Sequence, residues 1–181
     1  MKKLILIFMG TALLSACNND TKTSATKTGE DSTAQKSSTG LPYTPSYSAS
    51  FKMGNDDYSK MIVQGSWKDW ETNKMDNMKS WVADTIVAFQ SDNIMVKGID
   101  SLQAHWKKGR AEYTNVIDTL NAVMPVYSTD KKENWVLVWA TEIDTDKKGK
   151  IDTIAIMETW RINKDGKADQ LFQYDRHARK K

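Results

Sequence analysis

The stretch from Trp135 to His177 constrains the fold of this chain more than any other. Three long apolar runs are joined there by two short polar turns, Asp144–Lys150 and Asn163–Gly166. The Asp-Gly pair in the second turn strongly favours a β-hairpin. Successive side chains of a strand point to opposite faces, so the stretch predicts an antiparallel sheet that needs a covering layer on one side.

The preceding part of the chain supplies candidates for that layer. A helix is predicted over 55–73, because its apolar residues cover a wide arc at helical spacing. A short second helix follows, and a third is predicted over 101–112. A strand pattern at 85–96 lies between the second and third helices, and another at 114–127 follows the third. The chain is therefore predicted to form an α+β domain. Gly65 either weakens the first helix or allows a neighbour to approach closely.

The beginning of the chain has the pattern of a secretory signal peptide. Two lysines precede an apolar run from Leu4 to Leu14, which is too short to span a membrane. Leu14-Ser15-Ala16-Cys17 resembles the bacterial lipobox, which is cut before a cysteine that becomes lipid-modified. The alternative is an ordinary secretory signal in which this cysteine falls by chance. We expect Cys17, the one cysteine, to carry a lipid anchor in a membrane of the cell envelope, facing the periplasm or the cell surface.

Composition divides the rest of the chain. From Asn18 to Gly40 there is no large apolar or aromatic residue, so the segment cannot offset its ordering entropy and predicts a flexible tether. The predicted organisation is a signal peptide at 1–16, a lipidated cysteine and tether at 17–50, a folded domain at 51–178 and a basic tail at 179–181.

Charge and motifs exclude several functions. The net charge of +3 falls to +1 without Lys2 and Lys3, so a nucleic-acid partner is not expected. Two distant histidines without clustered cysteines do not predict zinc. The stretch Asp144–Asp152 resembles a calcium loop superficially, but Lys148 stands where an oxygen ligand is needed and Ala155 where glutamate is needed. No metal and no cofactor are therefore predicted.

Three segments carry a resemblance to a known superfamily. Residues 63–81 resemble the first helix pair of the nuclear transport factor 2-like superfamily, in its SnoaL-like branch. Residues 81–89 resemble its aromatic-x-Ala-Asp-Asp-x-x-x-Phe passage, with Thr85 in place of the second aspartate. Trp160–Lys167 and the following Gln173-Tyr174-Asp175 resemble its last hairpin.

The resemblance implies a cone-shaped, strongly curved antiparallel sheet wrapped around about three helices. It further implies an apolar cavity at the wide end and frequent homodimerisation through the outer sheet face. Members of the superfamily include isomerases, dehydratases, hydrolases and transport factors, so the resemblance leaves both catalysis and simple binding open.

An isomerase-like site would need a carboxylate with a raised pKa and a second donor in the cone. Acidic residues in or near the predicted strands are Asp84, Asp118, Glu142, Glu158 and Asp175. Alternation puts Glu158 on the same face as Trp160. On the inner face Glu158 would be a buried acid, and on the outer face a surface charge or dimer contact. The preferred interpretations are a structural or surface role for Glu158, a turn-orienting role for Asp84 and helix packing for His105, with catalysis as the alternative for each.

Tryptophan supplies much of the predicted core. We expect four tryptophans to line an apolar ligand pocket: Trp67, Trp81, Trp106 and Trp139. The sequence thus predicts a tethered, non-enzymatic domain that binds a small apolar ligand or a protein partner. The alternative is a small acid–base enzyme of the isomerase or dehydratase type that uses a carboxylate in the cone.

Overall fold

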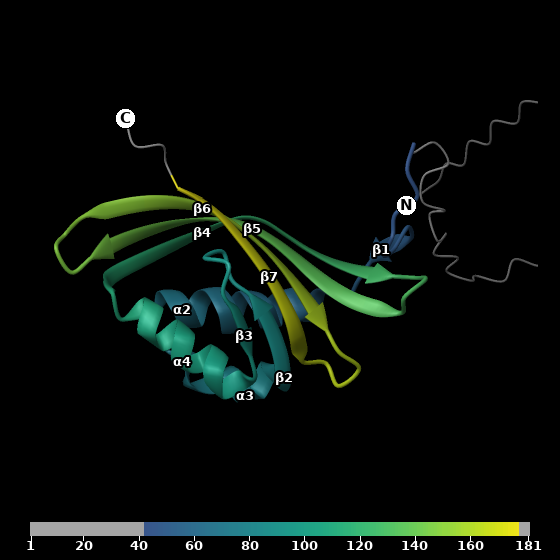
Figure 1. The fold of residues 1–181 in the computed structure, drawn as a ribbon, viewed down its shortest axis with the longest axis horizontal. Coiled ribbons are helices and arrows are strands. Elements are labelled where there is room, and N and C mark those ends of the chain that lie inside the picture. Colours follow the sequence, from purple (N-terminus) through teal and green to yellow (C-terminus); the bar gives the residue numbers. More distant parts are fainter. Residues whose placement is uncertain (1–41, 178–181) are drawn as a thin grey trace, which may run out of the picture. The chain divides into compact units, whose positions relative to one another are not determined.

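A computed structural model describes residues 42–177, which form one curved sheet with helices on its concave side (Figure 1). The strands are β1 (Phe51–Met53), β2 (Val82–Phe89), β3 (Met95–Lys97), β4 (Tyr113–Ser128), β5 (Glu133–Asp146), β6 (Ile151–Ile162) and β7 (Ala168–His177). The helical segments are α1 (Asp56–Ile62), η1 (Val63–Lys68), α2 (Asp69–Glu71), η2 (Met75–Asn77), α3 (Met78–Trp81) and α4 (Ile99–Arg110). The predicted α+β class and curved sheet are confirmed.

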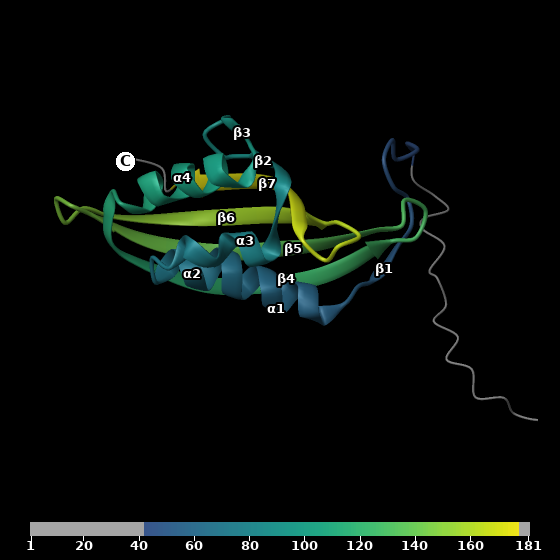
Figure 2. The same cartoon turned by 90° about the horizontal axis from the view of Figure 1, so that it is seen from below.

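The sheet has the order β1-β4-β5-β6-β7-β2-β3. Strands β4 to β7 pair in sequence as antiparallel hairpins, which the alternating apolar runs predicted. Two pairings were not predicted: β1 pairs with β4, and β2 pairs in parallel with β7. Figure 2 shows α1 and α2 along β4, and α4 on the side of β2 and β7. The helices therefore cover the concave face from both margins.

The first helix is a continuous succession of α1, η1 and α2. Asn55 caps it, because its side-chain oxygen accepts from the backbone N–H of Asp57 at 2.9 Å. Its middle part, η1, is a π-helical stretch. A Cβ at Gly65 would overlap the indole ring of Trp81, so this glycine allows a close approach between the helix and α3.

A chain of edge-to-face tryptophans runs through the core. Trp160 is fully buried, and its ring centroid lies 5.5 Å from that of Trp81 and 6.0 Å from that of Trp106. Trp106 in turn lies 6.3 Å from Trp70. Such perpendicular pairs place the positive edge of one ring against the negative face of the next. The core thus joins β6, α3, α4 and α2 through aromatic contacts.

The contacts of the folded part begin before residue 51, its predicted start. The ring of Tyr47 lies edge-on to Trp135 with centroids 6.0 Å apart. Asp130 accepts from the hydroxyl of Ser48 at 2.6 Å and from the backbone N–H of Ala49 at 3.1 Å. These contacts fasten the segment before β1 to the turn between β4 and β5.

The predicted signal peptide, the predicted lipid site Cys17, most of the tether and the whole basic tail lie outside residues 42–177. Within the described range, no helix combines the length and apolar character that a membrane span requires.

Candidate ligand cavity

A cavity of about 270 Å³ lies between the concave face of the sheet and the helices. Its walls come from η1, α2 and α4 on one side and from β4, β5, β6 and β7 on the other. The carboxyl-bearing residues in the lining are Asp92, Glu142, Asp144, Glu158 and Asp175. The aromatic residues in it are Trp67, Trp70, Trp106 and Tyr113. The lining thus mixes ring faces with acidic groups, where the sequence predicted an apolar pocket.

Glu158 points to the inner face, and only 3% of its surface is exposed. One carboxylate oxygen accepts from the indole N–H of Trp160 at 2.8 Å and from Ser66 at 3.5 Å, and the other accepts from Gln173 at 3.0 Å. Burial raises the pKa of Glu158, and these donors partly offset the rise by stabilising the charged form. Of the two preferred interpretations of Glu158, a surface role is therefore wrong, whereas a structural role agrees with its burial.

Three carboxyl groups meet on the inner face of β4 and β5. Asp118 and Glu142 are cross-strand partners, and Asp144 lies two residues further along β5. Burial raises the pKa of Glu142 to about 9, and the negative charges of Asp144 and Asp118 add to the rise. Burial likewise raises the pKa of Asp118 to about 7 and raises that of Asp144. Glu142 is accordingly protonated at neutral pH and can donate a hydrogen bond to a neighbouring carboxylate.

The proton on Glu142 does not meet the hydrogen-bonding capacity of the two neighbouring aspartates. Among the described residues, no N–H or hydroxyl group donates to the side-chain oxygens of Asp118 or Asp144. One O–H group of Glu142 cannot pair with all four of these oxygens. Asp144 is 2% exposed and lines the cavity, so its unmet hydrogen-bonding capacity faces the interior.

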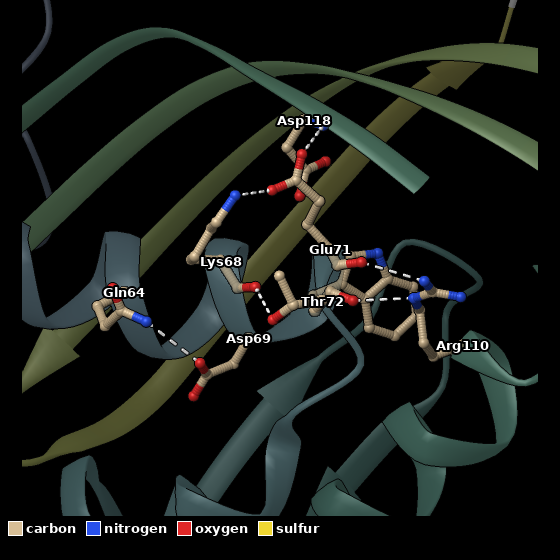
Figure 3. A network of polar contacts seen from close by, with 8 residues as sticks. Gln64, Lys68, Asp69, Glu71, Thr72, Arg110 and Asp118 are labelled. Carbon is tan, nitrogen blue, oxygen red and sulfur yellow. Dashed lines mark hydrogen bonds and ion pairs between the residues drawn. The ribbon is translucent and has the colours of Figure 1, made fainter. Parts of the chain in front are cut away.

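Arg110 lies beyond Glu71 from Asp118, one member of this cluster (Figure 3). Its guanidinium donates to the backbone carbonyls of Trp70 at 2.8 Å, Glu71 at 3.1 Å and Tyr113 at 3.0 Å. It thereby ties the end of α2 to the start of β4, and its charge partly offsets the rise in the pKa of Asp144 that burial causes. The Glu71 carboxylate accepts from Lys68, which lowers its pKa, and from the backbone N–H of Asp118 at 3.4 Å.

The predicted pocket tryptophans separate into two groups. Trp67 and Trp106 line the cavity. Trp81 lies behind Trp160 and does not line it. Trp139 alternates with the buried Val138 and Ala140, so it lies on the outer face of β5. Placing Trp81 and Trp139 in this pocket was therefore wrong.

The remaining candidate acids and bases also divide into residues that line the cavity and one that does not. His105 lines the cavity from α4, so it shares the site with Glu158. Asp84 is exposed on β2 and does not line the cavity. His177 lines it from the end of β7, where its ring lies 3.1 Å from Asp152. Of the three catalytic candidates, Glu158 and His105 thus line one cavity and Asp84 does not.

Several cavity residues were missed by sequence reasoning. Asp144 and Tyr113 were not considered as lining, and neither were Gln90 and Gln173. Gln90 accepts from the Trp106 indole N–H at 3.3 Å, but its own amide nitrogen has no partner among the described residues. A signal for Asp144 existed, because it continues the even-numbered inner face of β5.

No group of three or more His, Cys, Asp or Glu side chains is arranged to hold a metal within residues 42–177. In the stretch that resembles a calcium loop, Asp146 instead accepts from the backbone N–H groups of Lys148 and Lys150, at 2.8 and 2.9 Å. Those are the contacts of a hairpin turn.

A second, apolar groove of about 520 Å³ lies on the outer face of the sheet. It is lined by Tyr47, Phe51, Met124, Val126, Trp135, Leu137, Thr159, Phe172 and Tyr174. Apolar residues thus occupy both faces of the central strands.

The arrangement defines a cone-shaped α+β domain with a cavity under its sheet, and solved structures share its fold. No protein-family model and no curated protein matches the sequence. A putative polyketide cyclase, IdmH from Streptomyces antibioticus, is 10% identical with a TM-score of 0.54, over 65% of this chain and 91% of that one. A ketosteroid isomerase from Mycobacterium sp. is 16% identical with a TM-score of 0.52, over 67% and 98%. RV0760c from Mycobacterium tuberculosis, solved with estradiol-17β-hemisuccinate, is 15% identical with a TM-score of 0.52, over 65% and 92%.

The chain therefore has the nuclear transport factor 2-like fold that its sequence resembles. Proteins with this fold include enzymes and ligand binders, so the fold by itself assigns neither role.

Proposed function

We propose that this protein binds a small molecule in the cavity under its sheet and does not transform it. The observation that carries the proposal is a set of buried polar groups that line the cavity without protein partners, among them the amide nitrogen of Gln90 and the indole N–H of Trp70. Unpaired buried donors are costly, and a bound molecule would satisfy them. The rings of Trp67 and Trp106 and the side chains of Ile154 and Ile156 suit an apolar body on that molecule.

The state of Glu158 supports binding over catalysis. Hydrogen bonds to the charged form of a carboxylate stabilise that form and make the group a weaker base. Both oxygens of Glu158 already accept hydrogen bonds from Trp160, Gln173 or Ser66. These contacts hold the carboxylate still and engage it with the protein itself.

Filling the cavity tests the proposal. Gly109 lines the cavity from α4, and a Cβ there would meet Trp70 at an ordinary 3.6 Å. Gly109→Ala should therefore keep ligand binding, whereas Gly109→Leu should abolish it by occupying the space. Native mass spectrometry of purified protein would detect a co-purified small molecule, and tryptophan fluorescence would follow its titration. Equal binding by the two variants would refute the cavity as the site.

Acid–base catalysis is the second candidate, because a specific observation favours it. Glu142 is protonated at neutral pH and adjoins the carboxyl of Asp144 in a cavity that also holds Glu158. A proton donor beside a buried base is the arrangement that isomerisation of an unsaturated ketone uses. Conversion of a β,γ-unsaturated cyclic ketone, followed by ultraviolet absorption, tests this candidate. Activity that Glu158→Gln removes would support it, and no conversion above buffer would exclude this reaction.

We also propose that the protein is anchored at Cys17 to a membrane of a bacterial cell envelope. The support is the lipobox-like sequence before this cysteine and the polar stretch after it. Lipidation predicts that the protein partitions with membranes, and that its mass exceeds that of the chain cut before Cys17 by the added lipid. Cys17→Ser should move it to the soluble fraction without that mass increase. Unchanged partitioning would overturn the anchor.

The outer groove is the proposed surface for a second copy of the chain, or for another protein partner. Its support is the apolar character of residues such as Leu137 and Phe172 on an open sheet face. Light scattering of the protein should give the mass of a dimer, and Leu137→Glu should give that of a monomer. A monomer at all accessible concentrations would exclude self-association.

A further inference from the structure

The charge of the cavity lining is one-sided. Five of the described residues that line it carry carboxyl groups. No lysine or arginine is among these lining residues. The histidines His105 and His177 are its basic side chains. An anionic ligand would be repelled by such walls, because like charges repel each other strongly where water is scarce.

Asp144 requires a donor that the protein does not supply. It is 98% buried, since 2% of its surface is exposed, and it lines the cavity. Neither of its oxygens accepts from an N–H or hydroxyl group in the described part of the chain. The single O–H of Glu142 cannot meet this need, because Glu142 adjoins Asp118 as well as Asp144. A neutral apolar ligand would leave this carboxyl unpaired and would remove its access to water.

Aromatic ring faces stand in the same lining. The rings come from α2 (Trp70), α4 (Trp106) and β4 (Tyr113). The ring centroids of the two tryptophans are 6.3 Å apart, and their planes are nearly perpendicular. The face of an aromatic ring is electronegative and attracts an organic cation. Carboxyl groups and ring faces together select for a positive charge on an otherwise apolar molecule.

We propose that the ligand is a small protonated amine, with its ammonium group at Asp144 and its apolar body against Trp106 and Trp70. This inference rests on the proposed ligand-binding function of the cavity. An ammonium group has three N–H donors, which can pair with both oxygens of Asp144 and with a neighbouring acceptor. A bare metal ion fits less well, since no group of three metal-ligating side chains is arranged for it among residues 42–177. The cavity volume of about 270 Å³ suits a molecule with a single ring or a short chain.

Binding of a cation should release protons. Burial raises the pKa of Asp144, and the groups whose charges also act on it are Arg110, Asp152 and His177. Arg110 and His177 favour its ionised form, and Asp152 opposes it. A bound ammonium group would add a further positive charge, so part of the cluster would lose its protons on binding.

Three probes of similar shape and different charge test the proposal on the full chain. Benzylamine is a cation at neutral pH, benzyl alcohol is neutral and benzoate is an anion. Titration calorimetry should show benzylamine binding most tightly, with a heat that changes with the ionisation enthalpy of the buffer. Asp144→Asn keeps the side-chain shape and should weaken benzylamine by roughly tenfold or more, with little effect on benzyl alcohol. Asp165→Asn, in an exposed turn, makes the same change of net charge and should alter neither.

The outcomes separate this inference from the proposed function. Benzyl alcohol or benzoate binding as tightly as benzylamine would overturn the cationic ligand and leave the binding cavity intact. Benzylamine binding that Asp144→Asn and Asp165→Asn weaken equally would also overturn it, because the effect would then come from net charge alone. No binding of any probe at millimolar concentration would overturn both proposals. Circular dichroism of each variant checks that the fold is retained.

Discussion

Trp160 donates its indole N–H to the carboxylate of Glu158 at 2.8 Å, from two residues further along the same strand. Residues at this spacing share one face of a strand, so a single face of β6 carries the acid and a donor for it. Trp160 is also the middle of the aromatic chain that joins Trp81 and Trp106. A core packing residue thus also stabilises the charged form of a cavity acid.

Trp160→Phe should destabilise the protein and make its stability more sensitive to pH. The change leaves a small void and removes a donor to Glu158, at a cost of about 2–4 kcal/mol. Because that donor lowers the pKa of Glu158, its loss should raise the pKa further, and unfolding should become easier as pH rises. Urea denaturation across the pH range measures both effects.

Trp81→Phe is the matched control, since the Trp81 indole N–H has no partner among the described residues. It should lower stability through packing and leave the slope of stability against pH unchanged. Equal slopes for the Trp160 and Trp81 variants would contradict the role assigned to the hydrogen bond.

Alkaline pH should destabilise the protein through the carboxyl cluster. The pKa of Glu142 is raised from 4.5 to about 9, so the folded state holds a proton that the unfolded state releases. The stability that this proton contributes is fully present below pH 4.5 and is lost as pH rises through about 9. Asp118, raised from 3.8 to about 7, acts in the same direction. The midpoint of thermal unfolding should accordingly fall between weakly acidic and alkaline buffer.

Glu142→Gln should flatten this dependence, because glutamine is neutral at every pH. Glu112→Gln, at an exposed position directly before β4, provides the control and should keep the pH dependence of stability of the parent protein. A pH profile that Glu142→Gln leaves unchanged would show that the cluster does not titrate on unfolding.

Arg110→Met should be strongly destabilising. The substitution keeps a long apolar side chain but removes the donors to the carbonyls of Trp70, Glu71 and Tyr113. Leaving such carbonyls without partners costs about 2–4 kcal/mol in free energy of unfolding. Lys107 lies on the same helix as Arg110 and forms an exposed ion pair with Asp76. Lys107→Met breaks this pair and should cost less than about 1 kcal/mol. Chemical denaturation of the two variants should separate them clearly.

Gly65→Ala should cost about 1–3 kcal/mol, because the added methyl group overlaps the Trp81 ring and forces the helix away from α3. Gly109→Ala adds the same methyl group to α4 at an uncrowded position and should be neutral or slightly stabilising. If both variants unfold at the same denaturant concentration, the close approach at Gly65 does not constrain the fold.

Sequence reasoning succeeded where one local pattern determined the outcome. Alternation placed Glu158 and Trp160 on the same face, and the Asp-Gly turn placed the last hairpin. Which face is inner could not be derived, because the central strands are apolar on both sides. Val138 is buried under the helices, whereas Leu137 and Trp139 belong to the outer face. That symmetry explains why Trp139 was assigned to the cavity.

Long-range pairing was equally inaccessible. β1 has three residues, Phe51–Met53, too few to show any alternation. The carboxyl cluster needs β4 and β5 in one register, with Asp118 opposite Glu142, and nothing local to either strand fixes that register. The acids could be identified from the sequence, but their meeting required the fold.

The parallel pairing of β2 with β7 also determines when the protein can function. β2 finds its parallel neighbour only after β4, β5 and β6 have been made, and β7 then supplies Gln173 and Asp175 to the cavity. A chain that stops before residue 168 lacks both the strand that joins β2 to the rest of the sheet and part of the site. During synthesis the domain should therefore acquire its fold and its binding site together, and only near completion of the chain.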